Sequence, residues 1–145
     1  FMMQDTLKKF RCPESLVKEY KNWLLLCRLK QKTLGSLVLL CKDEVDSFSK
    51  ISDDSFGELS VIIREVEGNL KKELNYDKIN YQMWMMSDPE VHFHIFPRFS
   101  TDKEMFGFVF KDASWPGTLG ENDLNQIGDD IYLKLLSKLK DLFNK

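Results

Sequence analysis

The chain has 145 residues, 43% of them hydrophobic and 30% charged, and its 21 basic and 23 acidic side chains give a net charge of −2. This length predicts a single domain over residues 2–145, with the composition of an ordinary globular protein. No basic block indicates a nucleic-acid-binding arm, and no run reaches the roughly 20 apolar residues of a membrane span. Neither a nucleic acid nor a membrane is therefore an expected partner.

The cysteines Cys12, Cys27 and Cys41 are odd in number and widely spaced, which favours reduced thiols over a disulfide framework. Their spacing does not predict a structural zinc site. The first residues lack the apolar stretch of a secretory signal. We therefore expect a cytoplasmic protein.

The first third of the chain predicts one short helix and two strands. Pro13 suits the first turn of a helix over residues 13–20. Apolar runs of strand length follow at 22–29 and 36–42, separated by a short polar loop, and this arrangement predicts an antiparallel pair.

Two longer helices are predicted from caps and apolar periodicity. The first covers residues 53–74, with Ser52 as N-cap and Asn75 as C-cap, and its apolar residues recur at helical spacing. The second lies near the C-terminus and is capped by Asn122 or Asp123.

Three more strands are predicted between these helices. Residues 78–86 and 90–97 form a hairpin around the turn signal at 87–89, and residues 104–110 form a further strand. The order of elements predicts an α+β domain. We expect a mainly antiparallel five-stranded sheet with a long central helix and a C-terminal helix.

The protein's two histidines, His92 and His94, lie two residues apart in the strand predicted at 90–97. Side chains alternate between the faces of a strand, so both imidazoles share one face, while Val91 and Phe93 share the other. Two imidazoles on one face are the best candidates for chemistry in this chain.

Three interpretations of this pair compete. The imidazoles could be structural, hydrogen-bonded within the sheet. With Glu90 on the same face they could ligate a metal ion. The third interpretation is nucleophilic catalysis: a neutral imidazole attacks phosphorus well near pH 7, and a second imidazole can contact the phosphate.

Segment 92–98 (His-Phe-His-Ile-Phe-Pro-Arg) resembles the motif strand of the histidine triad (HIT) family, in which three histidines alternate with apolar residues before Pro-Arg. Segment 35–42 resembles the family's strand that runs from a glycine to a lysine, and the long helix and the hairpin come in the family's order. The resemblance is closest to bacterial HIT-like hydrolases with a Glu-x-His-x-His strand.

The resemblance implies an α+β meander, usually a homodimer, that binds a small-molecule nucleotide and needs no cofactor. It implies hydrolysis or nucleotidyl transfer at the α-phosphate of a dinucleoside polyphosphate or nucleoside phosphoramidate, through a covalent nucleotidyl-histidine intermediate. His92 matches the family's nucleophile and His94 its phosphate contact. Glu90 stands in the place of the first histidine and is expected to orient His92.

The predicted substrate-binding residues lie on three segments. Arg28 stands where the family has an acidic ribose contact, and it suits either a phosphate or a solvated position. Asn80, Gln82 and Trp84 share one face of their strand and line the pocket if that face is the histidine face. Trp84 could stack on a base or belong to the core. Arg98 ends the motif strand.

Two alternatives stay open. Glu90 in place of a histidine, and the short loop at 87–89, also fit a nucleotide-binding protein without turnover. A metal site at Glu90, His92 and His94 is the other.

Overall fold

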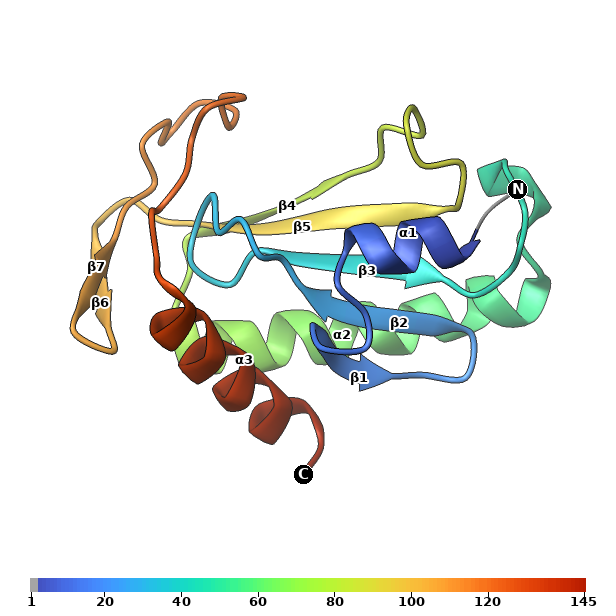
Figure 1. Ribbon diagram of the computed structural model, residues 1–145, viewed down its shortest axis with the longest axis horizontal. Helices are drawn as coiled ribbons and strands as arrows, with labels where there is room; N and C mark the ends of the chain where they lie inside the picture. Colours follow the sequence, from blue (N-terminus) through green and yellow to red (C-terminus); the bar gives the residue numbers. More distant parts are fainter. Residues whose placement is uncertain (1–2) are drawn as a thin grey trace.

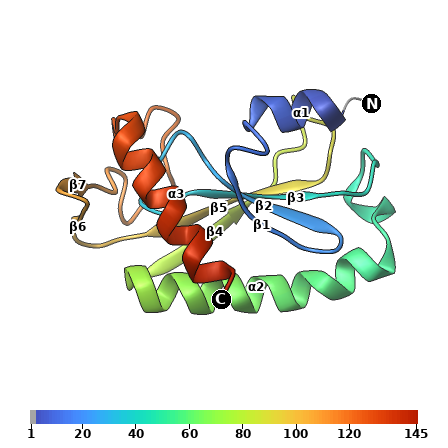
Figure 2. The ribbon, with the colours of Figure 1, turned by 60° about the horizontal axis from the view of Figure 1, so that its bottom comes forward.

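A five-stranded antiparallel sheet lies between helices (Figures 1 and 2). The computed structural model describes residues 3–145, so residue 2 of the predicted domain lies outside it. The strands follow the order β1-β2-β3-β5-β4 across the sheet. Their bounds are β1 (Leu16–Glu19), β2 (Trp23–Cys27), β3 (Leu37–Cys41), β4 (Lys78–Gln82) and β5 (His92–Arg98). The predicted α+β class with a mainly antiparallel five-stranded sheet is confirmed.

The helices lie on different sides of this sheet. Figure 2 shows α1 (Met3–Lys9) above one face and α2 (Asp53–Leu74) beneath the other. The helix α3 (Asp129–Phe143) packs against β1 and α2. A 3₁₀ turn, η1 (Phe48–Lys50), precedes α2. No helix within residues 3–145 is long and apolar enough to cross a membrane.

The main core lies between the sheet and α2. Strands β2 and β3 are almost wholly apolar because they lie inside the sheet and are covered on both faces. Alternate residues face α2, where Leu25, Leu39 and Ile95 pack in one buried cluster with Val66 and Leu70. Full burial of each such side chain contributes about 1.5–3 kcal/mol.

The long helix has the predicted ends. The Ser52 hydroxyl accepts a hydrogen bond from the Ser55 amide, and Asn75 adopts the left-handed conformation, with φ 50°, that ends a helix. Its buried stripe runs from Ile62 to Leu74. Phe56, near the start of the helix, is 41% exposed and its ring lies 5.5 Å from that of Phe48.

The predicted helix over 13–20 is wrong, because residues 16–19 form β1 and the first helix lies at 3–9. Only Val17 of β1 is buried in the core, whereas Leu16 and Lys18 are partly exposed and Glu19 is exposed. A segment with so few apolar positions folds as an edge strand once the backbone of β2 is available to pair with it.

The strand predicted at 104–110 is also corrected. Phe106 and Gly107 have φ values of 58° and 75°, so the chain reverses there. Two short strands, β6 (Lys103–Met105) and β7 (Phe108–Phe110), form a separate two-stranded sheet. The fifth strand of the main sheet is therefore β1.

The C-terminal helix begins at Asp129, with Gly128 as N-cap, rather than near residue 122. The Asn125 amide donates to the carbonyls of Gln31, Lys32 and Lys111, and this holds its segment against a distant loop. The Asp123 carboxylate accepts from the Gly120 amide and the Ser114 hydroxyl. Asp123, one of the two predicted caps, therefore bonds within the preceding loop instead of capping this helix.

A buried ion pair fixes the loop that follows β7. Arg98 donates from Nε and Nη2 to the two Asp112 oxygens at 2.7 and 3.0 Å, and both side chains are nearly inaccessible. Nη1 donates to Asn80 on β4, and Nη2 also donates to the Gly117 carbonyl. The guanidinium thus joins the end of β5 to the loop that reaches the candidate site.

We predict that Asp112→Ala lowers the free energy of unfolding by about 3–5 kcal/mol, because it leaves a buried guanidinium unpaired. Urea unfolding followed by circular dichroism measures this change. Asp46→Ala, which breaks the exposed Lys50–Asp46 pair, is the control and should leave the midpoint in place. Equal midpoints for wild type and Asp112→Ala would contradict the assigned role.

Candidate active site

The two histidines occupy the face of the sheet that α1 covers. His94 pairs laterally with Val38 on β3 and with Gln82 on β4, and Val38 pairs with Leu26 on β2. Laterally paired residues share a face, so these four side chains form a row across the sheet. Phe93 points to the opposite side, where it packs on Trp23. The predicted alternation of β5 therefore matches the structure.

His92 is buried, with 3% exposure, and its ring centroid lies 5.2 Å from that of His94. Its Nδ1 lies 2.7 Å from the backbone carbonyl oxygen of Glu90. A carbonyl only accepts hydrogen bonds, so Nδ1 carries the proton and Nε2 of the neutral ring keeps its lone pair. This is the tautomer that a nucleophilic Nε2 needs.

The Glu90 carboxylate does not make this contact. Glu90 lies before β5 begins and is fully buried, where its Oε2 accepts from the Thr6 hydroxyl of α1 at 2.5 Å. Its Oε1 is buried without a hydrogen-bond partner among the described residues. The orienting bond to His92 thus comes from the backbone of Glu90, whereas its side chain anchors α1.

Lys9 adds a second link between α1 and this loop, through its ion pair with Asp88 at 2.8 Å. Beside it, the Phe10 ring lies 5.9 Å from the ring of His92 and 6.1 Å from that of His94. A phenylalanine after a short helix carries no functional signal in the sequence, so Phe10 was missed.

His94 is half-buried and its ring stacks on Phe96, at 6.1 Å between centroids and 10° between planes. Burial, the Arg28 guanidinium and the neighbouring His92 lower the pKa of His94 to about 4. His94 is therefore neutral at pH 7. Its Nδ1 is buried and has no hydrogen-bond partner within residues 3–145.

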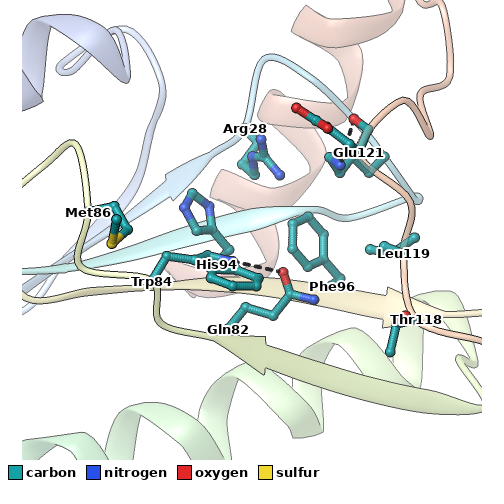
Figure 3. A pocket seen from close by; sticks show the side chains of 10 residues that line it. Arg28, Gln82, Trp84, Met86, His94, Phe96, Thr118, Leu119 and Glu121 are labelled. Carbon is teal, nitrogen blue, oxygen red and sulfur yellow. Dashed lines mark hydrogen bonds between the residues drawn. The ribbon is translucent and has the colours of Figure 1, made fainter.

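A cavity of about 730 Å³ opens beside His94 (Figure 3). The predicted residues Arg28, Gln82 and Trp84 line it. Trp84 is 65% exposed and its Nε1 donates weakly to Gln82 Oε1 at 3.4 Å, so it is not a core residue. The remaining lining residues, which the sequence did not single out, are Lys32, Met86, Phe96, Thr118, Leu119 and Glu121.

Asn80 and Arg98 do not line this cavity. They line a neighbouring hollow of about 310 Å³ near Gly117. The Arg98 guanidinium already donates hydrogen bonds to Asp112, to Asn80 and to the backbone carbonyl of Gly117. Asn80 and Arg98 therefore hold the loop in place and do not line the cavity beside His94. From this loop, Thr118, Leu119 and Glu121 line that cavity.

A second cavity, of about 330 Å³, lies between α1 and β2. Its walls combine apolar and basic side chains, and none of the described residues that line it is acidic. They are Lys9, Phe10, Leu26, Cys27, Arg28, Leu29, Lys30 and Val38. Arg28 lines both cavities, so they adjoin at this residue.

Within residues 3–145, no three His, Cys, Asp or Glu side chains gather so that they could hold a metal ion. The Glu90 carboxylate instead accepts a hydrogen bond from the Thr6 hydroxyl. The donor geometry does not favour the metal alternative.

Comparisons with known proteins agree with this architecture. A histidine triad protein from Marinobacter aquaeolei VT8 matches with a TM-score of 0.75 at 14% identity, over 99% of this chain and 96% of that one. One from Sinorhizobium meliloti 1021 matches with a TM-score of 0.72 at 14% identity, over 97% and 96%. A hypothetical histidine triad nucleotide-binding protein from Sulfolobus tokodaii strain7 matches with a TM-score of 0.68 at 14% identity, over 96% and 89%.

No curated protein sequence matches this chain. The family model described as the HIT domain, however, matches residues 9–101, which include the whole five-stranded sheet and both histidines. The resemblance drawn from the motif strand is confirmed, and this chain belongs to the HIT family.

Proposed function

We propose that this protein is a nucleotide hydrolase or nucleotidyl transferase in which His92 attacks the α-phosphate of its substrate. One observation carries the proposal: the bond from His92 Nδ1 to the Glu90 carbonyl leaves Nε2 with a free lone pair. The reaction forms a bond from Nε2 to phosphorus and breaks the bond from phosphorus to the leaving group, which departs with the electron pair. Water, or another acceptor, then displaces Nε2 and restores the imidazole.

The two cavities suit the two ends of a nucleotide. The apolar walls of the cavity under α1, including Phe10, Leu26 and Val38, suit a base. The cavity beside His94 carries the Arg28 and Lys32 cations, which suit phosphate groups. A HIT protein with a similar fold is named nucleotide-binding, which is consistent with this assignment.

Neutral His94 supports catalysis by hydrogen bonding. A phosphate placed against His94 brings negative charge to the ring and raises the pKa of His94 from its low value. The imidazole then donates to the phosphate oxygens as charge develops on them. This is the role that the sequence resemblance implied for His94.

Access to His92 depends on Phe10. His92 is 3% exposed and the Phe10 ring lies against both imidazoles. We infer that phosphorus reaches Nε2 after side chains that cover His92, among them Phe10, move aside. The expected homodimer stays a prediction.

A nucleotide-binding protein without turnover is the second candidate. The position of the first triad histidine holds Glu90, whose carboxylate is engaged by Thr6. Under this alternative a nucleotide binds and no covalent adduct forms.

We predict that His92→Ala reduces turnover of a nucleoside phosphoramidate or a dinucleoside polyphosphate by on the order of 10⁴-fold, because it removes the nucleophile. Wild type quenched in denaturant at alkaline pH, which preserves a phosphorus–nitrogen bond, should show an added nucleotidyl mass on the peptide containing His92, and the variant should not. Glu104→Gln, which changes an exposed carboxylate on β6, is the control for turnover.

The outcome separates the two candidates. Wild type that binds nucleotide but gives neither adduct nor product supports binding without turnover. Full activity in a folded His92→Ala variant would contradict nucleophilic attack by His92.

We predict that His94 titrates with a midpoint near pH 4, well below the ordinary value of about 6.5. Arg28→Gln should raise this midpoint, because removing a nearby positive charge favours the imidazolium. Ring-proton NMR across pH 3–8 measures it, and Lys30→Gln is the charge-matched control. A wild-type midpoint at or above 6.5 contradicts the assigned environment.

A further inference from the structure

Arg28 lies at the junction of the two cavities, directly after β2. Its backbone amide donates to the Ser36 carbonyl at 3.0 Å, which fixes its position relative to β3. Its guanidinium carbon lies 5.1 Å from the centre of the Phe96 ring. The same ring stacks on His94, so Arg28 and His94 are held by a common aromatic platform.

The guanidinium of Arg28 has no carboxylate partner within residues 3–145. Arg98, the other arginine buried near the site, is fully engaged by Asp112. Burial lowers the pKa of Arg28 to about 10, so the group stays charged at pH 7. A half-buried, unpaired guanidinium is costly to keep unless a ligand supplies the counter-charge.

The surroundings of Arg28 add positive charge. Lys30 lines the cavity under α1, and Lys32 lines the cavity beside His94, where its Nζ donates to the carbonyls of Gly120 and Glu121. Among residues 3–145, Glu121 is the one acidic residue that lines either cavity, and it lies near Lys32. The junction is therefore a cationic position between an apolar cavity and the paired histidines.

A nucleotide has its base, ribose and 5′-phosphate in that order. If the base occupies the cavity under α1 and the phosphate lies against His94, the ribose lies at Arg28. A ribose with free hydroxyls is neutral and leaves the guanidinium unpaired. A phosphate on the ribose would accept two parallel hydrogen bonds from it.

We propose that Arg28 binds a second anionic group on the substrate, so that this protein selects nucleotides carrying a phosphate on the ribose 2′ or 3′ oxygen in addition to the 5′-phosphate. This inference rests on the proposed function for the placement of base and 5′-phosphate. It identifies Arg28 as the residue that determines specificity, and nucleoside bisphosphates as the ligand class.

Isothermal titration calorimetry at fixed ionic strength tests it with adenosine and guanosine 5′-monophosphates and the corresponding 2′,5′- and 3′,5′-bisphosphates. Wild type should bind one bisphosphate at least about 10-fold more tightly than its monophosphate, as expected for a charge-assisted bidentate contact. Arg28→Gln should reduce that ratio to about one. Arg28→Lys should keep part of it, and Lys30→Gln should preserve it.

Each other outcome overturns a defined part of the argument. Equal binding of monophosphate and bisphosphates by wild type overturns the inference and leaves the proposed function standing. If the preference for the bisphosphate remains in Arg28→Gln but is lost in Lys30→Gln, Lys30 binds the second phosphate, and the inference about Arg28 is wrong. An equal loss of monophosphate and bisphosphate affinity in Arg28→Gln places the guanidinium on the 5′-phosphate instead. If wild type binds none of these nucleotides at millimolar concentration, both proposals fail.

Discussion

The pairing of β5 with β3 and β4 is the constraint on which the rest of the site depends. An inner strand has no freedom of register, since a shift by one residue would exchange its two faces. Phe93 and Ile95 must face the core above α2, so His92 and His94 must face α1. The same pairing places Val38 and Gln82 beside His94. Core packing thus fixes the positions of the two imidazoles.

The second constraint is the closure of that face by α1. The Thr6–Glu90 and Lys9–Asp88 contacts hold the helix to the loop before β5, and Phe10 then lies on both imidazoles. This arrangement makes one cavity between α1 and β2 and leaves the other open beside Trp84. Burial under α1 and the charge of Arg28 together keep His94 neutral at pH 7. The helix therefore shapes both the space and the electrostatics of the site.

Much of the fold could be predicted from local patterns. The caps at Ser52 and Asn75 and the strands around Gly35 and His92 follow from backbone chemistry within a few residues. The errors arose where side chains bond to distant backbone, as Asn125 does with the loop at residue 31, or where an edge strand has few apolar residues, as in β1. Such segments carry little local preference, so tertiary partners decide their conformation.

By itself, the sequence determined that two imidazoles share a strand face, because a period of two is a local property of the backbone. The resemblance of that strand to the HIT motif further implied an α+β domain of the HIT type. Only the tertiary structure decided which other groups meet the two imidazoles. In the folded chain Arg28, Gln82 and Trp84 line the cavity beside His94. Asn80 and Arg98 instead take part in the hydrogen bonds that hold the loop at Asp112. The hydrogen bond to His92 Nδ1 comes from the backbone carbonyl of Glu90. These outcomes depend on contacts between segments far apart in the chain, which no local pattern encodes.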